Sequence, residues 1–300
     1  MAELKQTGRN SLALDKGFGN NLANILIAIF LIGVAFASII PMWHVLMASL
    51  SDGKKLLAHE GLLWLPEGQA SLGGYKIMFA DLSILKGYLN TIIYVLGTTG
   101  FAIIFNTLGG YVLSRETRMK TILTIFVTFT MLFNGGLIPS YMVIRSLGWV
   151  GTRWALLIPG CTNAFFVVML MNAFRNVPQS TVESARIDGA GHIRVMFQVI
   201  LPQAKSMLTV VIIQSVVMQW NSWFPASIYI PNKRDLWPLQ LWIKQLVADN
   251  ANILQAANPD YDRWLVQYAV IIAATLPILI TFPFFQKRLE SGMIIGGVKE

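Results

Sequence analysis

The chain has 300 residues, of which 55% are hydrophobic and only 13% are charged. An ordinary soluble domain carries about 25% charged residues, so this composition excludes a disordered chain and disfavours a soluble enzyme, and the single cysteine excludes a disulfide scaffold. The net charge is +8, but the basic residues are scattered between apolar runs rather than clustered, so we expect no nucleic-acid partner.

Six long runs of the sequence contain no charged residue, and each is at least as long as the roughly 20 residues that a helix needs to cross a bilayer. A charge inside a span costs about 2.5–3.5 kcal/mol, which explains why a membrane would exclude charges from all six. We therefore predict an all-α polytopic membrane protein with a cytoplasmic N-terminal segment, 1–21, and a single transmembrane domain, 22–300. Its six transmembrane helices are expected at about 22–50, 88–114, 121–143, 154–174, 206–230 and 264–286.

The loops between these runs indicate the orientation of the chain. The short loop Arg115–Lys120 holds three basic residues and one acidic residue, which is typical of the cytoplasmic side. This places both termini in the cytoplasm, with 175–205 as an inner loop and 52–86 and 231–263 as outer loops.

The second outer loop shows a helical repeat of apolar residues. Leu239, Trp242, Ile243 and Leu246 recur at the spacing i, i+3, i+4, i+7, which predicts a short amphipathic helix. Trp237 and Trp242 are either aromatic residues of the membrane interface or a contact surface for a partner.

Motifs for catalysis and metal binding are absent from the sequence. It contains no phosphate-binding P-loop, no H-E-x-x-H pair and no cysteine–histidine cluster. The predicted spans contain no Asp or Glu, which argues against a proton-relay carrier. We therefore expect no catalytic residue, no metal site and no cofactor in this chain, and a conduit whose energy is supplied by another subunit.

The inner loop carries the most informative pattern. Ser180-x-x-Glu183 has the form of a capping box that begins a helix, and Asp188-Gly189 has the form of its end. The sequence predicts a helix of about eight residues between them. Pro202 marks a kink or a start where the chain enters the fifth span.

This segment resembles the EAA loop of ABC importer permeases, whose pattern is E-A-A-x3-G-x9-I-x-L-P. Glu183, Ala185, Gly189, Leu201 and Pro202 match at the correct spacing, while Ser184 replaces an alanine and Val199 replaces an isoleucine. The resemblance implies a helix that couples transport to ATP hydrolysis in a partner. The coupling residues that it implies are Glu183, Ser184, Ala185, Asp188, Gly189, Ala190, Leu201 and Pro202.

The resemblance extends over nearly the whole chain, to the carbohydrate-uptake, maltose-permease-like branch and its type I ABC importer permease fold. The segments Asn134–Pro139 and Trp220–Phe224 are similar to the subgroup that handles oligosaccharides or polysaccharide fragments. The resemblance implies an inner-membrane protein that pairs with a second homologous permease subunit. It also implies two ATPase subunits that bind ATP and Mg, and an extracytoplasmic sugar-binding protein that docks on the outer loops. The C-terminal residues 296–300 would also touch the ATPase.

A sugar path needs hydrogen-bonding groups together with aromatic faces. The spans offer polar and aromatic residues of this kind, although polar residues in membranes often only bond a neighbouring helix. The absence of Lys and Arg from the spans slightly favours a neutral sugar. The candidate path residues are Asn134, Gln214, Gln219, Trp220, Asn221 and Trp223.

Three other functions stay open at this point. One is an ABC importer permease for a non-sugar solute, which the six spans and large outer loops disfavour. Another is an ATP-independent secondary carrier, which would not explain the EAA-like loop. The third is a membrane scaffold without transport, against which the polar and aromatic residues of the fifth span argue weakly.

Overall fold

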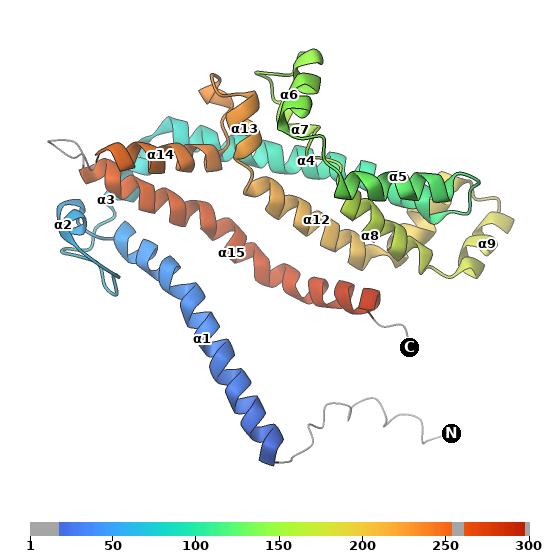
Figure 1. Cartoon of the computed structure of the whole chain (residues 1–300), viewed down its shortest axis with the longest axis horizontal. Coiled ribbons are helices and arrows are strands. Elements are labelled where there is room, and N and C mark those ends of the chain that lie inside the picture. Colours follow the sequence, from blue (N-terminus) through green and yellow to red (C-terminus); the bar gives the residue numbers. More distant parts are fainter. Residues whose placement is uncertain (1–17, 254–260, 298–300) are drawn as a thin grey trace.

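The computed structural model describes residues 18–253 and 261–297, and every regular element in these ranges is helical. Several long helices run along one axis of the molecule, whereas α1 (Phe18–Ser49) and α6 (Leu137–Ser146) are steeply inclined to it (Figure 1). At one end lies α9 (Gln179–Ile187), and at the other lie α2 (Gly53–Ala58), α3 (Gly73–Ala80) and α14 (Leu239–Ile253). We call these the α9 end and the α14 end.

Three long helices correspond to three of the predicted spans. They are α1 (Phe18–Ser49), α4 (Leu82–Ser114) and α15 (Tyr261–Gly297), for the predictions 22–50, 88–114 and 264–286. Each is long and apolar enough to cross a membrane. The predicted helical class is therefore confirmed. The charge-free runs of the sequence correctly predicted where these three helices lie.

Two further predicted spans are broken rather than straight, and a sharp bend lies inside the first and just before the second. The run 121–143 forms α5 (Lys120–Leu132) and α6 (Leu137–Ser146), which meet at 113°, with Gly136 between them at a φ of +89°. The run 206–230 forms α12 (Lys205–Trp220) and α13 (Phe224–Tyr229), and α12 is bent by 85° from the helical segment His192–Gln203 before it. The pair α5 and α6 is together long and apolar enough to cross a membrane, and so is the pair formed by His192–Gln203 and α12.

The predicted span 154–174 is not a single helix, which corrects the prediction. It consists of α7 (Trp154–Leu157) and the 12-residue α8 (Ala164–Arg175), and neither reaches the roughly 20 residues of a full crossing. Pro159 and Gly160 interrupt it, and the Asn163 side chain accepts a hydrogen bond from the Phe165 amide to begin α8. By length and composition alone, three to five segments of the described residues qualify as crossings, and the count of six spans stays a prediction.

The centre of the bundle is α4, which packs against α8, α12 and α14. Its glycines let these neighbours approach closely. A Cβ added at Gly97 would lie 2.7 Å from Leu157, and one at Gly110 would lie 2.8 Å from Leu170. Small residues at helix contacts are a usual means of packing in membranes.

Polar side chains inside this core serve packing. The Asn106 amide on α4 donates to the Cys161 carbonyl at 3.2 Å, and its oxygen accepts from the Asn163 amide. The pair of bonds fastens the connection between α7 and α8 to α4.

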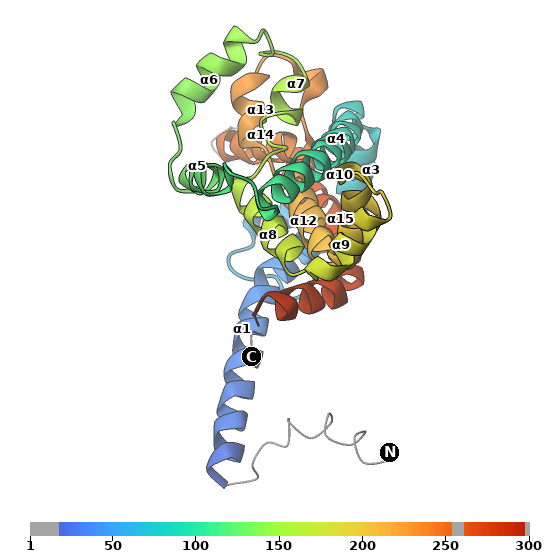
Figure 2. The same ribbon diagram turned by 90° about the vertical axis from the view of Figure 1, so that its right-hand side faces the viewer.

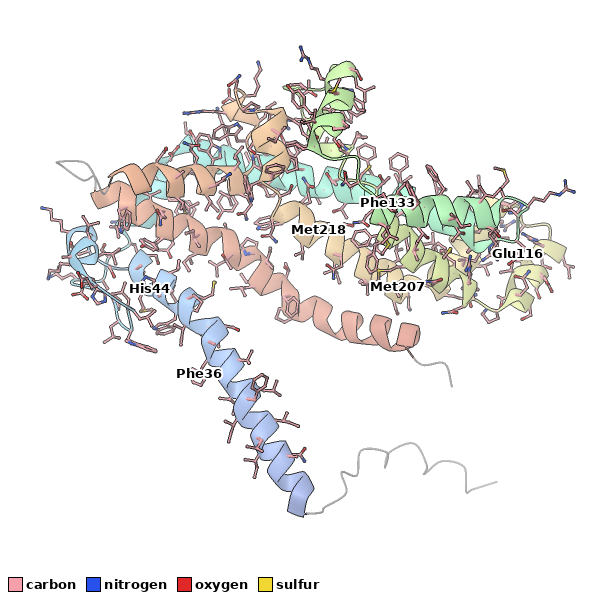
Figure 3. The ribbon with its side chains drawn as sticks, viewed as in Figure 1. Phe36, His44, Glu116, Phe133, Met207 and Met218 are labelled. Carbon is pink, nitrogen blue, oxygen red and sulfur yellow. The ribbon has the colours of Figure 1, made fainter. Side chains whose placement is uncertain are left out.

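The N-terminal part of α1 stands apart from the bundle, whereas its C-terminal end packs against α15 (Figures 1 and 2). Its side chains from Ala23 to Ile39 are exposed, and Phe36 points away from every other element, whereas the end around His44 meets the loop after α2 (Figure 3). His44 Nδ1 accepts a hydrogen bond from the Leu63 amide at 3.1 Å. The exposed apolar part suits lipid or another membrane subunit.

The amphipathic helix predicted from Leu239, Trp242, Ile243 and Leu246 is confirmed as α14, where Leu239 is buried and the other three are half-buried against the core. The interface role predicted for Trp237 is wrong. Its side chain is only 6% exposed, and its indole donates to the Ile230 carbonyl at 3.0 Å.

Candidate coupling helix and candidate solute path

The candidate coupling helix α9 begins two residues earlier than the sequence predicts. Its N-cap is Pro178, and no side chain caps it. Ser180 lies within the first turn, so the predicted capping box with Glu183 is wrong. Proline suits this position because it carries no amide hydrogen that would need a partner at a helix start.

The other end of α9 is confirmed. Gly189 has a φ of +81°, its amide bonds to the Arg186 carbonyl, and the Ala190 amide bonds to the Ala185 carbonyl at 2.9 Å. These two bonds form a Schellman motif, in which glycine supplies the left-handed residue. Ala185 and Ala190 also pack on the same apolar cluster, as this motif usually arranges.

The two faces of α9 differ sharply. Val182 is fully buried in a cluster with Phe174 and Met196, which fixes the helix to the bundle. Glu183, Ser184 and Asp188 are exposed, as is Ile187, which is 86% exposed. One side of α9 is thus anchored to the bundle, and the other side presents a carboxylate and an isoleucine. Such a helix is suited to docking a second protein.

The remaining predicted coupling residues lie on the segment that follows. It consists of α10 (His192–Val195), the π-helical turn Met196–Ile200 and α11 (Leu201–Gln203). Leu201 is half-buried on the α9 cluster, and Pro202 is exposed. Proline cannot donate to the preceding turn, and the Leu201 amide reaches back to Met196 instead, which produces the wide turn.

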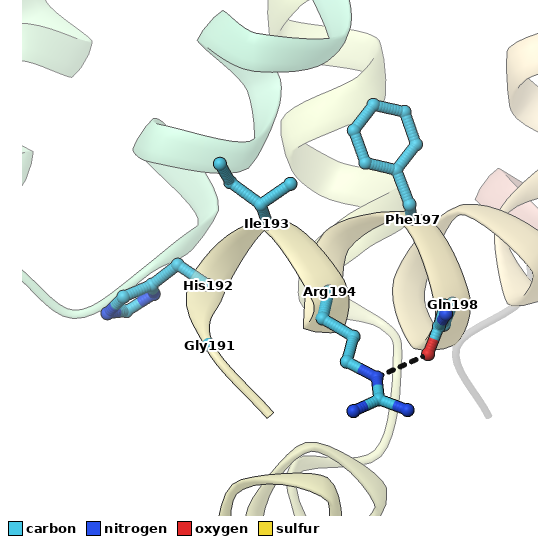
Figure 4. Close-up of a pocket in the computed structure, with 6 residues that line it drawn as sticks. All are labelled: Gly191, His192, Ile193, Arg194, Phe197 and Gln198. Carbon is cyan, nitrogen blue, oxygen red and sulfur yellow. Dashed lines mark hydrogen bonds between the residues drawn. The ribbon is translucent and has the colours of Figure 1, made fainter. Parts of the chain in front are cut away.

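A hollow of about 690 Å³ lies beside this segment (Figure 4). Ile193 and Phe197 project from the same side of the helix, while Arg194 donates to Gln198 at 2.9 Å on another side. Ile193 is 74% exposed. Ile193 and Phe197 therefore add exposed apolar surface on the segment that follows α9.

Long-range contacts that the sequence did not reveal tie this segment to α4 and tie α4 to α8. The Tyr111 hydroxyl lies 3.2 Å from Nδ1 and 3.2 Å from the carbonyl oxygen of His192. Arg115 donates to the Phe174 carbonyl, and Arg175 donates to the Leu113 carbonyl, so α4 and α8 are clamped at their ends. Residues about 60 to 80 positions apart give no local pattern that would predict these pairs.

The candidate path residues take different positions. Gln214 and Asn221 are exposed on or next to α12, and Gln219 is half-buried near Gly160. Trp220 is 8% exposed and donates to the Ala274 carbonyl of α15, so little of its surface is left for a solute. Asn134 belongs to the break between α5 and α6, where its side chain accepts from the Gly136 amide.

Among the six candidate path residues, Trp223 has the surroundings best suited to binding a solute. It is half-buried, and the Lys244 ammonium lies 3.4 Å from the centre of its ring. Phe224 meets it edge-on at 5.6 Å. An aromatic face beside a cation is a combination that can bind an anionic ring compound.

In the residues that the structure describes, no group of three His, Cys, Asp or Glu side chains is arranged to hold a metal ion.

Comparisons with known proteins agree with this architecture. Residues 77–295 match the family described as "Binding-protein-dependent transport system inner membrane component". The chain is 32% identical to the polygalacturonan/rhamnogalacturonan transport system permease protein YtcP of Bacillus subtilis (strain 168), covering 93% of this chain and 99% of that protein. It is 34% identical to protein LplC of the same organism, covering 93% and 94%.

A solved structure is also similar. It is described as a bacterial ABC transporter involved in the import of the acidic polysaccharide alginate, and one of its chains superposes with a TM-score of 0.81 at 27% identity. The match covers 90% of this chain and 98% of that chain.

The helical membrane bundle has the type I ABC importer permease fold, which the superposition with the alginate importer chain and the family match both support. The chain belongs to the family of binding-protein-dependent transport system inner membrane components, and it is a multi-pass transport subunit of the inner membrane.

Proposed function

We propose that this chain is the permease subunit of an ATP-driven oligosaccharide importer in which α9 docks on a separate ATPase subunit. The observation that carries the proposal is α9 itself, which buries Val182 and presents Glu183 and Ile187 outward at the end of the bundle. The ATPase would bind ATP and Mg, and its movement would be transmitted through α9 to the spans.

The assembly that we propose contains a second homologous permease, two ATPase subunits and an extracytoplasmic sugar-binding protein. The α9 end and both termini would lie in the cytoplasm, and the α14 end would receive the binding protein. The predicted tail contact of residues 296–300 falls at or beyond the end of the described residues.

We further propose that the solute is an oligosaccharide that carries carboxylates, such as a fragment of a uronic-acid polysaccharide. The names of two similar proteins, a polygalacturonan/rhamnogalacturonan permease and an alginate importer, support this class. Lys244 supports it independently, because its exposed ammonium lies over the Trp223 ring and can pair with a carboxylate, while the exposed Phe224 ring next to Trp223 offers an aromatic surface to a sugar ring. This replaces the slight preference for a neutral sugar, which rested only on the lack of cations inside the spans.

The test is ATP hydrolysis by the complete importer in proteoliposomes, measured with a panel of acidic and neutral oligosaccharides and the binding protein. We expect acidic oligosaccharides to stimulate hydrolysis. In Lys244→Gln, the KM for them should rise about fivefold to tenfold, as expected for the loss of one charge pair. Lys233→Gln, which removes an exposed cation from the same outer loop, is the matched control. Stimulation by neutral sugars alone would overturn the substrate class, and stimulation only by non-sugar solutes would overturn the oligosaccharide function.

A further inference from the structure

A second cavity, of about 340 Å³, lies between α4, α5 and α8, near the α9 end. Leu108 and Val112 of α4 form one wall, Leu123 and Val127 of α5 form the other, and Val167 of α8 lies at its base. The described residues that line it are apolar or glycine, so a solute such as a sugar would find few hydrogen-bonding side chains there.

The floor of this groove is created by Gly109. A Cβ at this position would lie 3.2 Å from Val167 Cγ1, so the two helices meet there without a side chain from α4. Leu108 and Val112 flank the contact and are about half exposed. In a bilayer, this surface opens toward the acyl chains of lipids.

Positive charge gathers at the end of the groove. Leu113 lines the cavity, and its carbonyl accepts the hydrogen bond from Arg175, so this guanidinium lies directly at the groove's end. Arg118 is exposed on the short loop that joins α4 to α5. Lys120 donates to Glu116, and this bond, together with the weaker effect of the Arg175 charge, lowers the pKa of the Glu116 carboxyl. One carboxylate therefore faces the cations Lys120, Arg175 and Arg118, which leaves positive charge in excess at this end of the groove.

We infer that this groove is a binding site for an anionic phospholipid. One acyl chain lies between α4 and α5, and the phosphate of the headgroup lies between Arg118 and Arg175. Basic pockets between transmembrane helices on the cytoplasmic side are places where anionic headgroups bind. The inference concerns only lipid and depends on no property of the transported solute.

The test uses the importer purified with its partner subunits and returned to phosphatidylcholine vesicles. The vesicles contain a trace of phosphatidylglycerol with a photoreactive group on its acyl chain. Labelled peptides are identified by mass spectrometry, and phosphatidylcholine with the same photoreactive chain is the comparison. We expect phosphatidylglycerol to label residues 108–127 more strongly than phosphatidylcholine does.

Two kinds of variant test the contribution of the groove and the contribution of the positive charge separately. Val127→Trp fills the groove and should abolish the preferential labelling, whereas Phe126→Trp, on the exposed side of the same helix, should not. Arg118→Gln should reduce the preference for phosphatidylglycerol about fivefold, the expected effect of one cation near an anionic headgroup. Arg145→Gln, an exposed cation of α6, is its control.

Equal labelling by the two lipids would overturn the inference, since it would show ordinary contact with bulk lipid. A Val127→Cys variant that cross-links to another subunit of the complex would also overturn it, because protein would then cover the groove.

Discussion

The hydroxyl of Tyr111 joins α4 to the segment that follows the coupling helix, with His192 Nδ1 and the His192 carbonyl oxygen both 3.2 Å away. The hydroxyl has one proton, so donating it to the carbonyl leaves its oxygen to accept a proton carried by Nδ1. The Arg115 guanidinium lies 5.3 Å from the centre of the Tyr111 ring and holds it from another side. A displacement of α9 would therefore reach α4 through this residue.

Tyr111→Phe tests this connection while keeping the ring. Loss of the hydrogen bond should weaken the connection by about 1 kcal/mol, which corresponds to about a fivefold loss of substrate-stimulated over basal ATP hydrolysis. Tyr141→Phe, whose ring stacks on Tyr229 far from α9, should behave as wild type. Unchanged stimulation in Tyr111→Phe would show that motion is transmitted by another route.

Gly189→Ala tests the Schellman motif that ends α9. A left-handed alanine is unfavourable by about 1–2 kcal/mol, so the end of α9 should open about tenfold more often and expose the Arg186 peptide bond to trypsin. Gly191→Ala is matched closely, because Gly191 has ordinary backbone angles and equal space for a methyl group. Faster cleavage in both variants, or in neither, would contradict the role given to Gly189.

Gly110→Ala tests the close contact of α4 with α8. The added methyl group would lie 2.8 Å from Leu170 Cβ and 3.1 Å from the Met171 amide nitrogen, so the free energy of unfolding should fall by about 1–3 kcal/mol. Gly100→Ala on the same helix meets open space and should be neutral or slightly stabilising. Thermal unfolding of the purified variants in detergent distinguishes the two, and equal midpoints would argue against the close contact.

Asn90→Leu tests the attachment of the outer loop. The buried Asn90 amide donates to the Asp235 carbonyl at 2.7 Å, and its oxygen accepts from Arg153 at 3.0 Å. Removing it leaves these groups unpaired, so we expect a loss of about 1–3 kcal/mol in the free energy of unfolding. Lys86→Ala breaks only an exposed ion pair to the same loop and should change it by less than about 1 kcal/mol. A larger loss of unfolding free energy in Lys86→Ala than in Asn90→Leu would contradict the role given to Asn90.

Charge exclusion predicted where the apolar segments lie, because inserting a charge into lipid is unfavourable whatever the local backbone does. It says nothing about helix continuity, which is why α7 and α8 were predicted as one span. Pro159-Gly160 and Asn134-Gly135-Gly136 were the signals for the breaks, since proline and glycine end helices for local reasons.

The helix α9 was predictable at its end because that end depends on one local choice, glycine at position 189. Its beginning was not, since Pro178 and Ser180 are both acceptable near a helix start. Trp220 was assigned to the solute path from composition alone, and its bond to Ala274 depends on how α12 packs against α15. The division into segment 1–21 and domain 22–300 stays a prediction.

The most direct measurement is ATP hydrolysis and sugar uptake by the complete importer carrying Glu183→Ala, with Glu116→Ala as control. Glu183 is exposed on α9, so its removal should leave the fold intact. We expect the subunits to assemble less firmly, or hydrolysis to lose its response to sugar by at least about fivefold, with uptake lost in parallel. Wild-type assembly, stimulation and uptake in Glu183→Ala would contradict the coupling role of α9.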